Sequence, residues 1–591
     1  MKEQLKQLLA RRYVLPGSQA LERAYERFSP AERFLCVVFA VFLVFGAARL
    51  VYSINAQFLT EVPAVGGELR EGIIGSPRFL NPLLALSDAD RDLTALIYSG
   101  LLRTTPEGAL VPDLAERVDT DENGLTYTFH IREDATFHDG TPVTADDVLF
   151  TIQKAQDPTL KSPKRANWEG VSAEKKGEYE VTLTLKQPYA PFLENATLGI
   201  LPRRLWKDVE TEQFPFSSFN LSAVGSGPYR VTSVKRNALG IPLSIELSPF
   251  KNYALGAPYI SRFIMRFYAN EKELLAGFYR GEVESMNTVT PEAAKRLEGE
   301  GYRVERTLLP RIFGVFFNPN QSSLFAEKAV RQALELATDK ETMVNTVLYG
   351  YGVPIDDPVP PLLLNTRRAS ATSTEVRLAE ASMILEKAKW KQPEANGIRE
   401  KAKGPPARGA QAGKETQKLS FSLATSDVPE LREGAELLKA MWRRIGIETQ
   451  VQIFGAGDLN QNVIRPRKFD ALLFGEIIGR DFDLFAFWHS SQRNDPGLNI
   501  AMYTNSSVDK FLEEARRTTN PDKRGENYEK ALAVIRNDAP AVFLYSPEFI
   551  YVLPQKVRGF ARGRTTVPSE RFLDVRHWYI ETEKVWNSFN K

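Results

Sequence analysis

Hydrophobic residues alternate with polar ones, or run together, in several short stretches that predict β-strands. Tyr127, Phe129 and Ile131 are separated by single polar residues, a spacing typical of a strand with one buried face. The apolar runs at 312–317 and 541–545 are instead suited to strands that are buried on both faces. We therefore expect β-structure in widely separated parts of the chain.

Other stretches repeat their apolar residues every three or four positions, which predicts amphipathic helices. The clearest lie at residues 330–348, 378–390 and 431–445. The last of these is followed by Gly446, a residue type that commonly ends a helix. The second half of the chain is therefore expected to be rich in helices.

A turn and the start of a helix follow the strand around Phe129. Asp139 and Gly140 form a turn dipeptide, and Thr144 suits the N-cap of a helix. Asp147, three residues after Thr144, completes a variant of the capping box and places a negative charge in the positive first turn. We expect a strand, a turn and a helix in that order.

An apolar segment near the N-terminus predicts a membrane anchor. Residues 34–48 carry no charge, and residues 50–54 lengthen the segment if Arg49 extends towards the lipid head groups. The combined length approaches the roughly 20 residues that cross a bilayer. Residues 1–33 contain seven basic and four acidic side chains. By the positive-inside rule, this tail is expected in the cytoplasm, with an uncleaved signal anchor at 34–54 and the remaining body exported.

Three alternatives compete for the same segment. A cleaved signal peptide would use the small residues Gly46, Ala47 and Ala48, although residues 1–33 are long for its charged region. A lipoprotein anchor is disfavoured because Cys36 begins the apolar run, whereas a lipid-bearing cysteine would end it. The third alternative is a buried core helix.

Composition limits the function classes without choosing one. A chain of 591 residues exceeds a single core and predicts two or three domains. Its 76 basic and 74 acidic residues give a formal charge of +2, which offers no electrostatic case for nucleic-acid binding. One cysteine excludes an intrachain disulfide framework, and four scattered histidines disfavour a zinc site. No metal or cofactor is expected.

Residues 391–418 differ in composition from their surroundings. They contain seven basic and three acidic side chains, several prolines and glycines, and almost no apolar residues. Such a segment buries too little surface to offset the entropy of ordering it. We interpret it as a flexible surface insertion, with contact to a partner or an anionic membrane as the alternative.

Several motifs occur in a fixed order along the chain, and the longest is FHDGTPVTADDV at 137–148. Together they resemble the motifs of extracellular solute-binding proteins of family 5, the peptide/nickel family, which deliver ligands to ABC importers. The shorter matches are Ser76–Pro82, Ile97–Leu102, Gly225–Tyr229, Ala329–Lys340, Val347–Gly350, Arg444–Ile447 and Phe487–Ser491.

The resemblance implies an α/β, two-lobed periplasmic-binding-protein-like fold (type II, cluster C-like) with an extra subdomain, behind one N-terminal transmembrane helix. A short tether at 55–66 would lead to a first strand at 67–74. The first lobe would comprise residues 67–105, 225–314 and 536–591, the subdomain residues 106–224, and the second lobe residues 315–535.

The resemblance also implies a binding protein, not an enzyme. It would capture oligopeptides in an interlobe cleft and deliver them to the permease and ATPase subunits of an importer, as a monomer without nucleic acid. The same fold could instead bind a metal chelate, haem or a saccharide. A peptidase-like enzyme is the other alternative, against which stands the lack of a G-x-S-x-G or H-E-x-x-H motif.

Peptide binders of this kind often place an aspartate near residues 476–491 to pair with the ligand's ammonium group. A carboxylate suits that role because its charge-assisted hydrogen bond both binds and orients an amine. The chain departs from the usual motif here, so the choice between aspartates stays open, as does simple pairing with Arg480 or helix capping. The expected ligand-binding residues are Asp481, Asp483, Arg480, Phe485, Trp488 and Asn81.

Overall fold

The computed structural model describes residues 22–23, 25–360, 373–394, 397–402, 416–479, 483–518 and 520–586. The chain divides into two compact units. One contains residues 1–64 and 581–591, and the other, which we call the body, contains Val65–Ile580.

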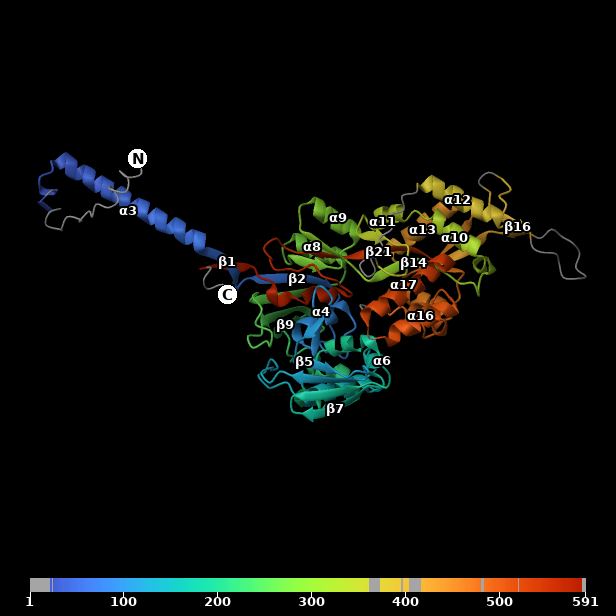
Figure 1. The fold of residues 1–591 in the computed structure, drawn as a ribbon, viewed down its shortest axis with the longest axis horizontal. Coiled ribbons are helices and arrows are strands. Elements are labelled where there is room, and N and C mark those ends of the chain that lie inside the picture. Colours follow the sequence, from blue (N-terminus) through green and yellow to red (C-terminus); the bar gives the residue numbers. More distant parts are fainter. Residues whose placement is uncertain are drawn as a thin grey trace, which may run out of the picture. The chain divides into compact units, whose positions relative to one another are not determined.

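The N-terminal unit is built on one long helix, α3 (Pro30–Phe58), which continues into strand β1 (Leu59–Ala64) (Figure 1). Ser29 and Glu32 form a reciprocal capping box at the start of the helix. Residues Pro30–Ser53 are long and apolar enough to cross a membrane, and none of this span is buried within the structure. The span therefore has the length and composition of a membrane anchor or of a signal sequence.

Strand β1 pairs antiparallel with β22 (Glu581–Trp586), close to the C-terminus. Residues 59–64, for which we predict part of a tether, thus form a strand, and its partner strand, residues 581–586, falls in the segment that we assign from the sequence to the first lobe. The backbone register of the pair is continuous, from Leu59 opposite Trp586 to Ala64 opposite Glu581. Such a long-range pairing leaves little trace in either sequence.

The body is organised around a mixed sheet. Its strands lie in the order β19 (Glu448–Phe454), β18 (Ser420–Ser426), β20 (Ala471–Ile477), β14 (Arg311–Phe317), β21 (Ala541–Val552), β12 (Ser285–Asn287), β2 (Glu68–Ile74), β11 (Arg262–Tyr268), β10 (Pro242–Pro249) and β9 (Tyr229–Arg236). Strands β13 (Val304–Leu308) and β15 (Gly352–Pro354) also pair with β21.

Two strand passages join the two halves of this sheet. Strand β21 pairs with β14 and β15 through its first half and with β12 and β13 through its second half. The other passage runs from β13 through Leu309 and Pro310 into β14. The buried strands predicted at 312–317 and 541–545 are therefore confirmed. We call the part built on β2 and β9–β13 the first lobe, and the part built on β14, β15 and β18–β20 the second lobe.

The second lobe packs helices on both faces of its sheet (Figure 1). Val315 and Phe317 of β14 enter one core and Phe316 enters the other, which explains the continuous apolar run in the sequence. The helices are α10 (Lys328–Ala337), α11 (Lys340–Val347), α12 (Thr374–Lys387), α13 (Pro429–Arg443), α16 (Ser506–Arg517) and α17 (Pro521–Asp538).

The first lobe carries helices α4 (Asp88–Ile97), α8 (Glu271–Tyr279) and α9 (Pro291–Gly299). A smaller antiparallel sheet lies in the same hydrophobic core, in the order β5 (Ala115–Thr120), β6 (Thr126–Ile131), β8 (Glu180–Thr184) and β7 (Ser172–Gly177). With α5 (Ala145–Gln156) and α6 (Arg165–Trp168) it forms what we call the subdomain.

The helix expected over residues 330–348 is two helices in the structure. The break lies at Thr338 and Asp339, where the Asp339 side chain accepts a hydrogen bond from the backbone N–H of Thr342 and caps α11. An aspartate in this position competes with the continuous helix. The helix expected at 431–445 is present as α13, and Gly446 adopts a positive φ of 79° after it.

The two ends of the segment 391–418, for which we predict a flexible insertion, contain regular structure. Strands β16 (Glu400–Ala402) and β17 (Thr416–Lys418) pair with each other. Arg399 is buried, and its guanidinium donates hydrogen bonds to the carbonyl oxygens of Ile445 and Trp390. A single anchored arginine thus holds one end of the segment against the lobe. Residues 395–396 and 403–415 lie outside the described residues.

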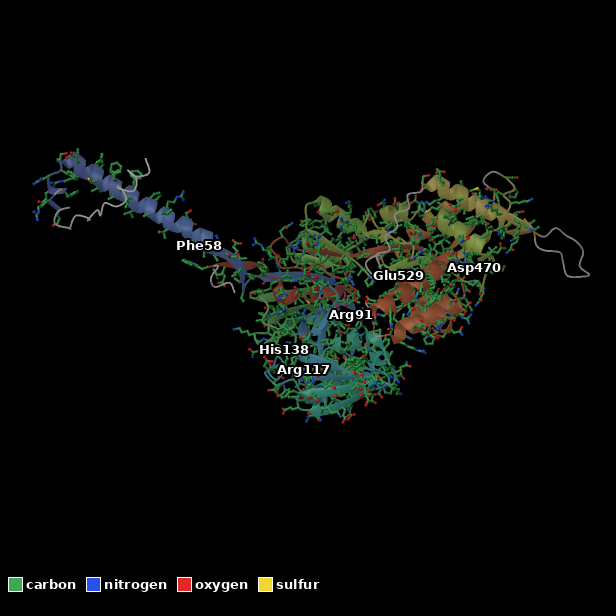
Figure 2. The ribbon with its side chains drawn as sticks, viewed as in Figure 1. Phe58, Arg91, Arg117, His138, Asp470 and Glu529 are labelled. Carbon is green, nitrogen blue, oxygen red and sulfur yellow. The ribbon has the colours of Figure 1, made fainter. Side chains whose placement is uncertain are left out.

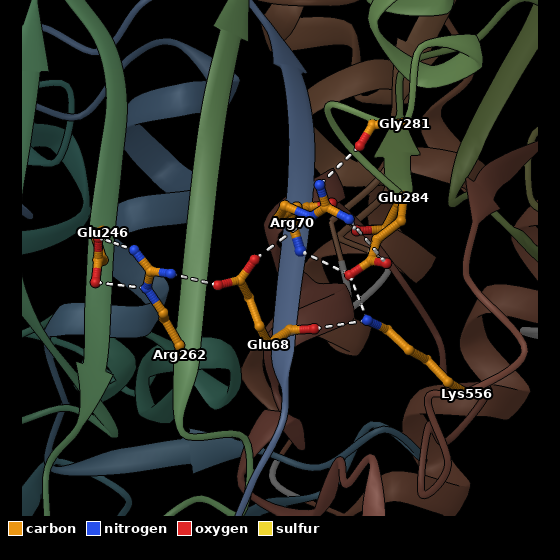
Figure 3. A network of polar contacts seen from close by, with 8 residues as sticks. Glu68, Arg70, Glu246, Arg262, Gly281, Glu284 and Lys556 are labelled. Carbon is orange, nitrogen blue, oxygen red and sulfur yellow. Dashed lines mark hydrogen bonds and ion pairs between the residues drawn. The ribbon is translucent and has the colours of Figure 1, made fainter.

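Charged side chains stabilise the first lobe in two different settings. An exposed network joins neighbouring strands: Arg262 contacts Glu246 and Glu68, and Lys556 contacts Glu284 (Figure 3). A second cluster is buried, with the side chains of Arg571, Glu71 and Asp92 at most 1% exposed. The two settings differ greatly in their expected contribution to stability.

Candidate functional site

Two sequence motifs meet where the subdomain joins the first lobe. The His138 ring contacts the carbonyl oxygen of Gly227 at 3.0 Å and accepts from the backbone N–H of Gly225 at 3.3 Å. Burial lowers the pKa of His138 to about 4, so the ring is neutral at physiological pH. The histidine therefore joins two backbone turns.

The turn around Gly225 and Gly227 packs directly on the end of α4. A Cβ atom at Gly225 would lie 2.1 Å from the carbonyl oxygen of Ile97, and one at Gly227 would lie 2.6 Å from its carbonyl carbon. Glycine is thus required by close backbone approach. The contact fixes the C-terminal end of α4, after which Tyr98 and Ser99 enter a cavity wall.

This cavity has a volume of about 500 Å³ and is the candidate functional site. Its walls come from α4 and the residues after it, from the subdomain segments around residues 164–168 and 194–199, and from the C-terminal residues 567–576. Among the described lining residues, Ile477 at the end of β20 comes from the second lobe, and it is 55% exposed. The cavity therefore lies in the first lobe and opens towards the second.

One end of the cavity contains a cluster of polar groups, defined here as the polar end: Ser99, Arg103, Asp113, Tyr253 and Arg576. Asp113 is 4% exposed, and its Oδ1 atom has no hydrogen-bond partner among the described residues. Burial raises the pKa of Asp113 to about 6, and the positive charge of Arg103 opposes this shift. Buried polar atoms without partners are costly, and clusters of them commonly mark binding sites.

Positive side chains continue along the cavity wall. Arg91 on α4 lies towards the second lobe (Figure 2), and Lys164 lies on the subdomain wall. Desolvation lowers the pKa of Lys164, and the nearby charge of Arg91 lowers it further. The wall thus gathers cations close enough to repel one another.

The predicted ammonium-binding residue Asp483 is engaged by a protein cation in the structure. Its carboxylate pairs with Arg516 at 2.7 Å and accepts a weaker hydrogen bond, at 3.3 Å, from the backbone N–H of Phe485. Arg516 also lies 4.3 Å from the ring centre of Phe485 and 5.7 Å from that of Tyr189 in the subdomain. A ligand-binding role for Asp483 stays a prediction, and would require Arg516 to release it.

Trp488, Asn81 and Phe485 are not among the residues that line the cavity. Trp488, on the short helix α15 (Phe485–Trp488), is 1% exposed and packs against Phe543 and Tyr503 in a core of the second lobe. Asn81 is fully buried, and its side chain accepts a hydrogen bond from the backbone N–H of Leu83.

Phe485 stacks on His489, with ring centres 4.0 Å apart. The Nε1 atom of Trp488 and the Nδ2 atom of Asn81 are buried without a hydrogen-bond partner among the described residues. A ligand-binding role for Phe485, Trp488 and Asn81 stays a prediction. Arg480 and Asp481 lie outside the described residues.

Sequence reasoning missed Glu476, the residue before Ile477. It is 5% exposed, and neither carboxylate oxygen has a partner among the described residues. Burial raises its pKa well above the usual range, which favours the neutral acid. The available signal was an acidic residue within the otherwise apolar run from Ala471 to Ile478. The polar end of the cavity gave no such signal, because its members come from three separate parts of the chain, at 99–113, 253 and 576.

Comparisons with known proteins place this geometry in a family. The oligopeptide-binding protein AppA of Bacillus subtilis is 28% identical over 551 residues, covering 92% of this chain and 97% of the relative. The solved structure of that protein with a nonapeptide matches with a TM-score of 0.65 and 27% identity, over 88% of this chain and all of the other. NikZ from Campylobacter jejuni in complex with Ni(L-His) matches with a TM-score of 0.65 and 26% identity, over 87% and 99% of the two chains.

The family match itself covers most of the chain. Residues 109–499 match the bacterial extracellular solute-binding proteins, family 5 (middle region). The fold agrees with these two-lobed relatives, which are solute-binding proteins and not enzymes. This chain therefore belongs to the family 5 extracellular solute-binding proteins.

Proposed function

We propose that this protein captures oligopeptides in the cavity of its first lobe, which opens towards the second, and delivers them to the permease and ATPase subunits of an ABC importer. The observation that carries the proposal is the cavity of about 500 Å³, which has partnerless polar atoms buried in its wall. Its volume lies within the range of about 300–1,000 Å³ typical of ligand sites. A relative that covers nearly the whole chain is an oligopeptide-binding protein.

The connection between the lobes supports capture by closure. In the described part of the chain, the lobes are connected by the backbone near Leu309–Pro310 and by the middle of β21, so bending at these two places would bring the second lobe towards the cavity. Hinge closure about a few residues at the ends of elements is a common way to enclose a ligand. Arg516 on α16 already reaches Tyr189 of the subdomain in this conformation. The protein is expected to act as a monomer.

Mass spectrometry of ligand released from the purified full-length protein tests the proposed ligand class. We expect peptide masses whose fragment spectra give sequences. A released haem, saccharide or nickel chelate would instead support the alternatives that share the fold. Turnover of added peptides, lost in a single-residue variant, would contradict a role limited to binding.

We further propose that α3 anchors the protein in the cytoplasmic membrane with the N-terminus inside. Its support is the exposed apolar span Pro30–Ser53 and the excess of basic residues before it. Protease added to intact spheroplasts should digest the body and leave a protected N-terminal fragment. A mature protein that begins near Ala48, or digestion of the N-terminal tail, would contradict the anchor.

A further inference from the structure

The two arginines at the polar end of the cavity lack partners for part of their donor groups. The Nε atoms of Arg103 and Arg576 are buried and make no hydrogen bond among the described residues. Arg576 is nevertheless held in place, because one terminal nitrogen donates to the carbonyl oxygen of Leu255. Both side chains line the same cavity, and their partnerless Nε atoms lie beneath its surface.

Asp113 does not neutralise both arginines. It is close enough for the charges of Arg103 and Arg576 to act on it, yet no nitrogen of either arginine lies within 4.0 Å of a carboxylate oxygen among the described residues. Within the polar end, one carboxylate stands against two guanidinium groups, and the exposed carboxylate of Glu107 acts on Arg103 from outside it. An ammonium group of a ligand would be repelled by this positive charge. An apolar ligand side chain would leave the buried donors without hydrogen bonds, at a free-energy cost of about 1–3 kcal/mol each.

The neighbouring wall has the same electrostatic character. Lys164 and Arg91 line the cavity, and Lys164 has no ion-pair partner among the described residues. Glu570 also lines the cavity, but its carboxylate accepts hydrogen bonds from the backbone N–H and hydroxyl of Thr566. Glu194 is a further acidic residue of the wall, so three lining carboxylates (Asp113, Glu194 and Glu570) stand against four lining cations (Arg91, Arg103, Lys164 and Arg576).

We propose that the polar end of the cavity binds a carboxylate group of the ligand through Arg103 and Arg576, while Asp113 accepts an N–H from the ligand backbone. This inference rests on the proposed function and names the ligand class: peptides that present an acidic side chain or a free C-terminus at this position. Guanidinium groups suit the role because they bind carboxylates through paired, charge-assisted hydrogen bonds.

Isothermal titration of the full-length protein in detergent tests the inference with matched peptides. One series carries Glu or Gln in turn at each position of a hexa-alanine peptide with an amidated C-terminus. A second series compares hexa-alanine peptides with free and amidated C-termini. Loss of the recognised carboxylate should weaken binding at least about tenfold. The two series distinguish a side-chain carboxylate from a terminal one.

Substitutions locate the effect. Arg103→Gln and Arg576→Gln should each remove most of the difference between acid and amide peptides. Arg117→Gln makes the same charge change on exposed strand β5 of the subdomain (Figure 2) and should preserve that difference. Thermal unfolding of each variant checks that the fold is retained. If a variant does not fold, the comparison of acid and amide peptides on the unchanged protein still tests carboxylate recognition.

The outcomes separate the inference from the function on which it rests. Tight binding of peptides with equal affinity for acid and amide forms would overturn carboxylate recognition and leave peptide capture standing. A preference that survives both arginine substitutions would also overturn it. Failure to bind any peptide, acidic or amidated, would contradict the proposed function and the inference together.

Discussion

Replacement of Arg571 by methionine is expected to lower the free energy of unfolding by about 3–5 kcal/mol. Arg571 contacts Asp92 through two hydrogen bonds, at 2.6 and 2.8 Å, and Glu71 at 2.9 Å. All three side chains are buried, so the methionine would leave two carboxylates without their cation. Urea denaturation followed by circular dichroism measures the loss.

Arg262→Met provides the matched control. Arg262 also contacts two carboxylates, those of Glu246 and Glu68, but its side chain is 49% exposed. Exposed ion pairs contribute about 0–1 kcal/mol because water screens them. If Arg571→Met cost no more than Arg262→Met, the buried cluster would not stabilise the fold in the way proposed.

The pH dependence gives an independent check. Burial raises the pKa of Asp92 to about 6 from its ordinary 3.8, although Arg571 opposes the shift. A group whose pKa is higher in the folded state favours folding as it takes up a proton. Its contribution therefore grows as the pH falls from about 7 towards 4. Without Arg571 the Asp92 carboxylate takes up a proton still more readily, so the penalty of Arg571→Met should shrink between pH 8 and pH 5.

The features that sequence predicted well are local. Thr144 and Asp147 lie three residues apart, and the Asp147 carboxylate accepts from the N–H of Thr144 at 2.9 Å, as the capping pattern indicated. The apolar runs of β14 and β21 were recognisable because residues on both faces of these strands enter cores. Capping patterns and apolar runs involve residues only a few positions apart, so they can be recognised in a single sequence.

The features that sequence did not predict depend on distant partners. Strands β1 and β22 lie more than 500 residues apart, and neither is strongly apolar. The polar end of the cavity combines residues from positions 99–113, 253 and 576, which only the folded chain brings together. The aromatic residues around Trp488 show a different limit of sequence reasoning. An aromatic side chain in a binding pocket and one in a hydrophobic core look alike in the sequence, and Trp488 belongs to a core.

Filling the cavity should remove peptide binding. Ala95 is an exposed residue of α4 that lines the cavity, so Ala95→Trp places an indole in the space without displacing a core side chain. Accommodating that ring beside a ligand is expected to cost about 1–3 kcal/mol. This cost corresponds to a loss of affinity of about 5- to 150-fold. The fold should stay intact, because the substitution lies on the cavity surface.

Isothermal titration of an oligopeptide into the full-length protein and its Ala95→Trp variant tests the central claim most directly. Ala379→Trp is the matched control, because Ala379 is an exposed residue of a helix, α12, that does not line the cavity. Binding in the cavity predicts that Ala95→Trp loses affinity while Ala379→Trp and the unchanged protein bind alike. Equal affinity in all three proteins would contradict the cavity as the site of peptide capture.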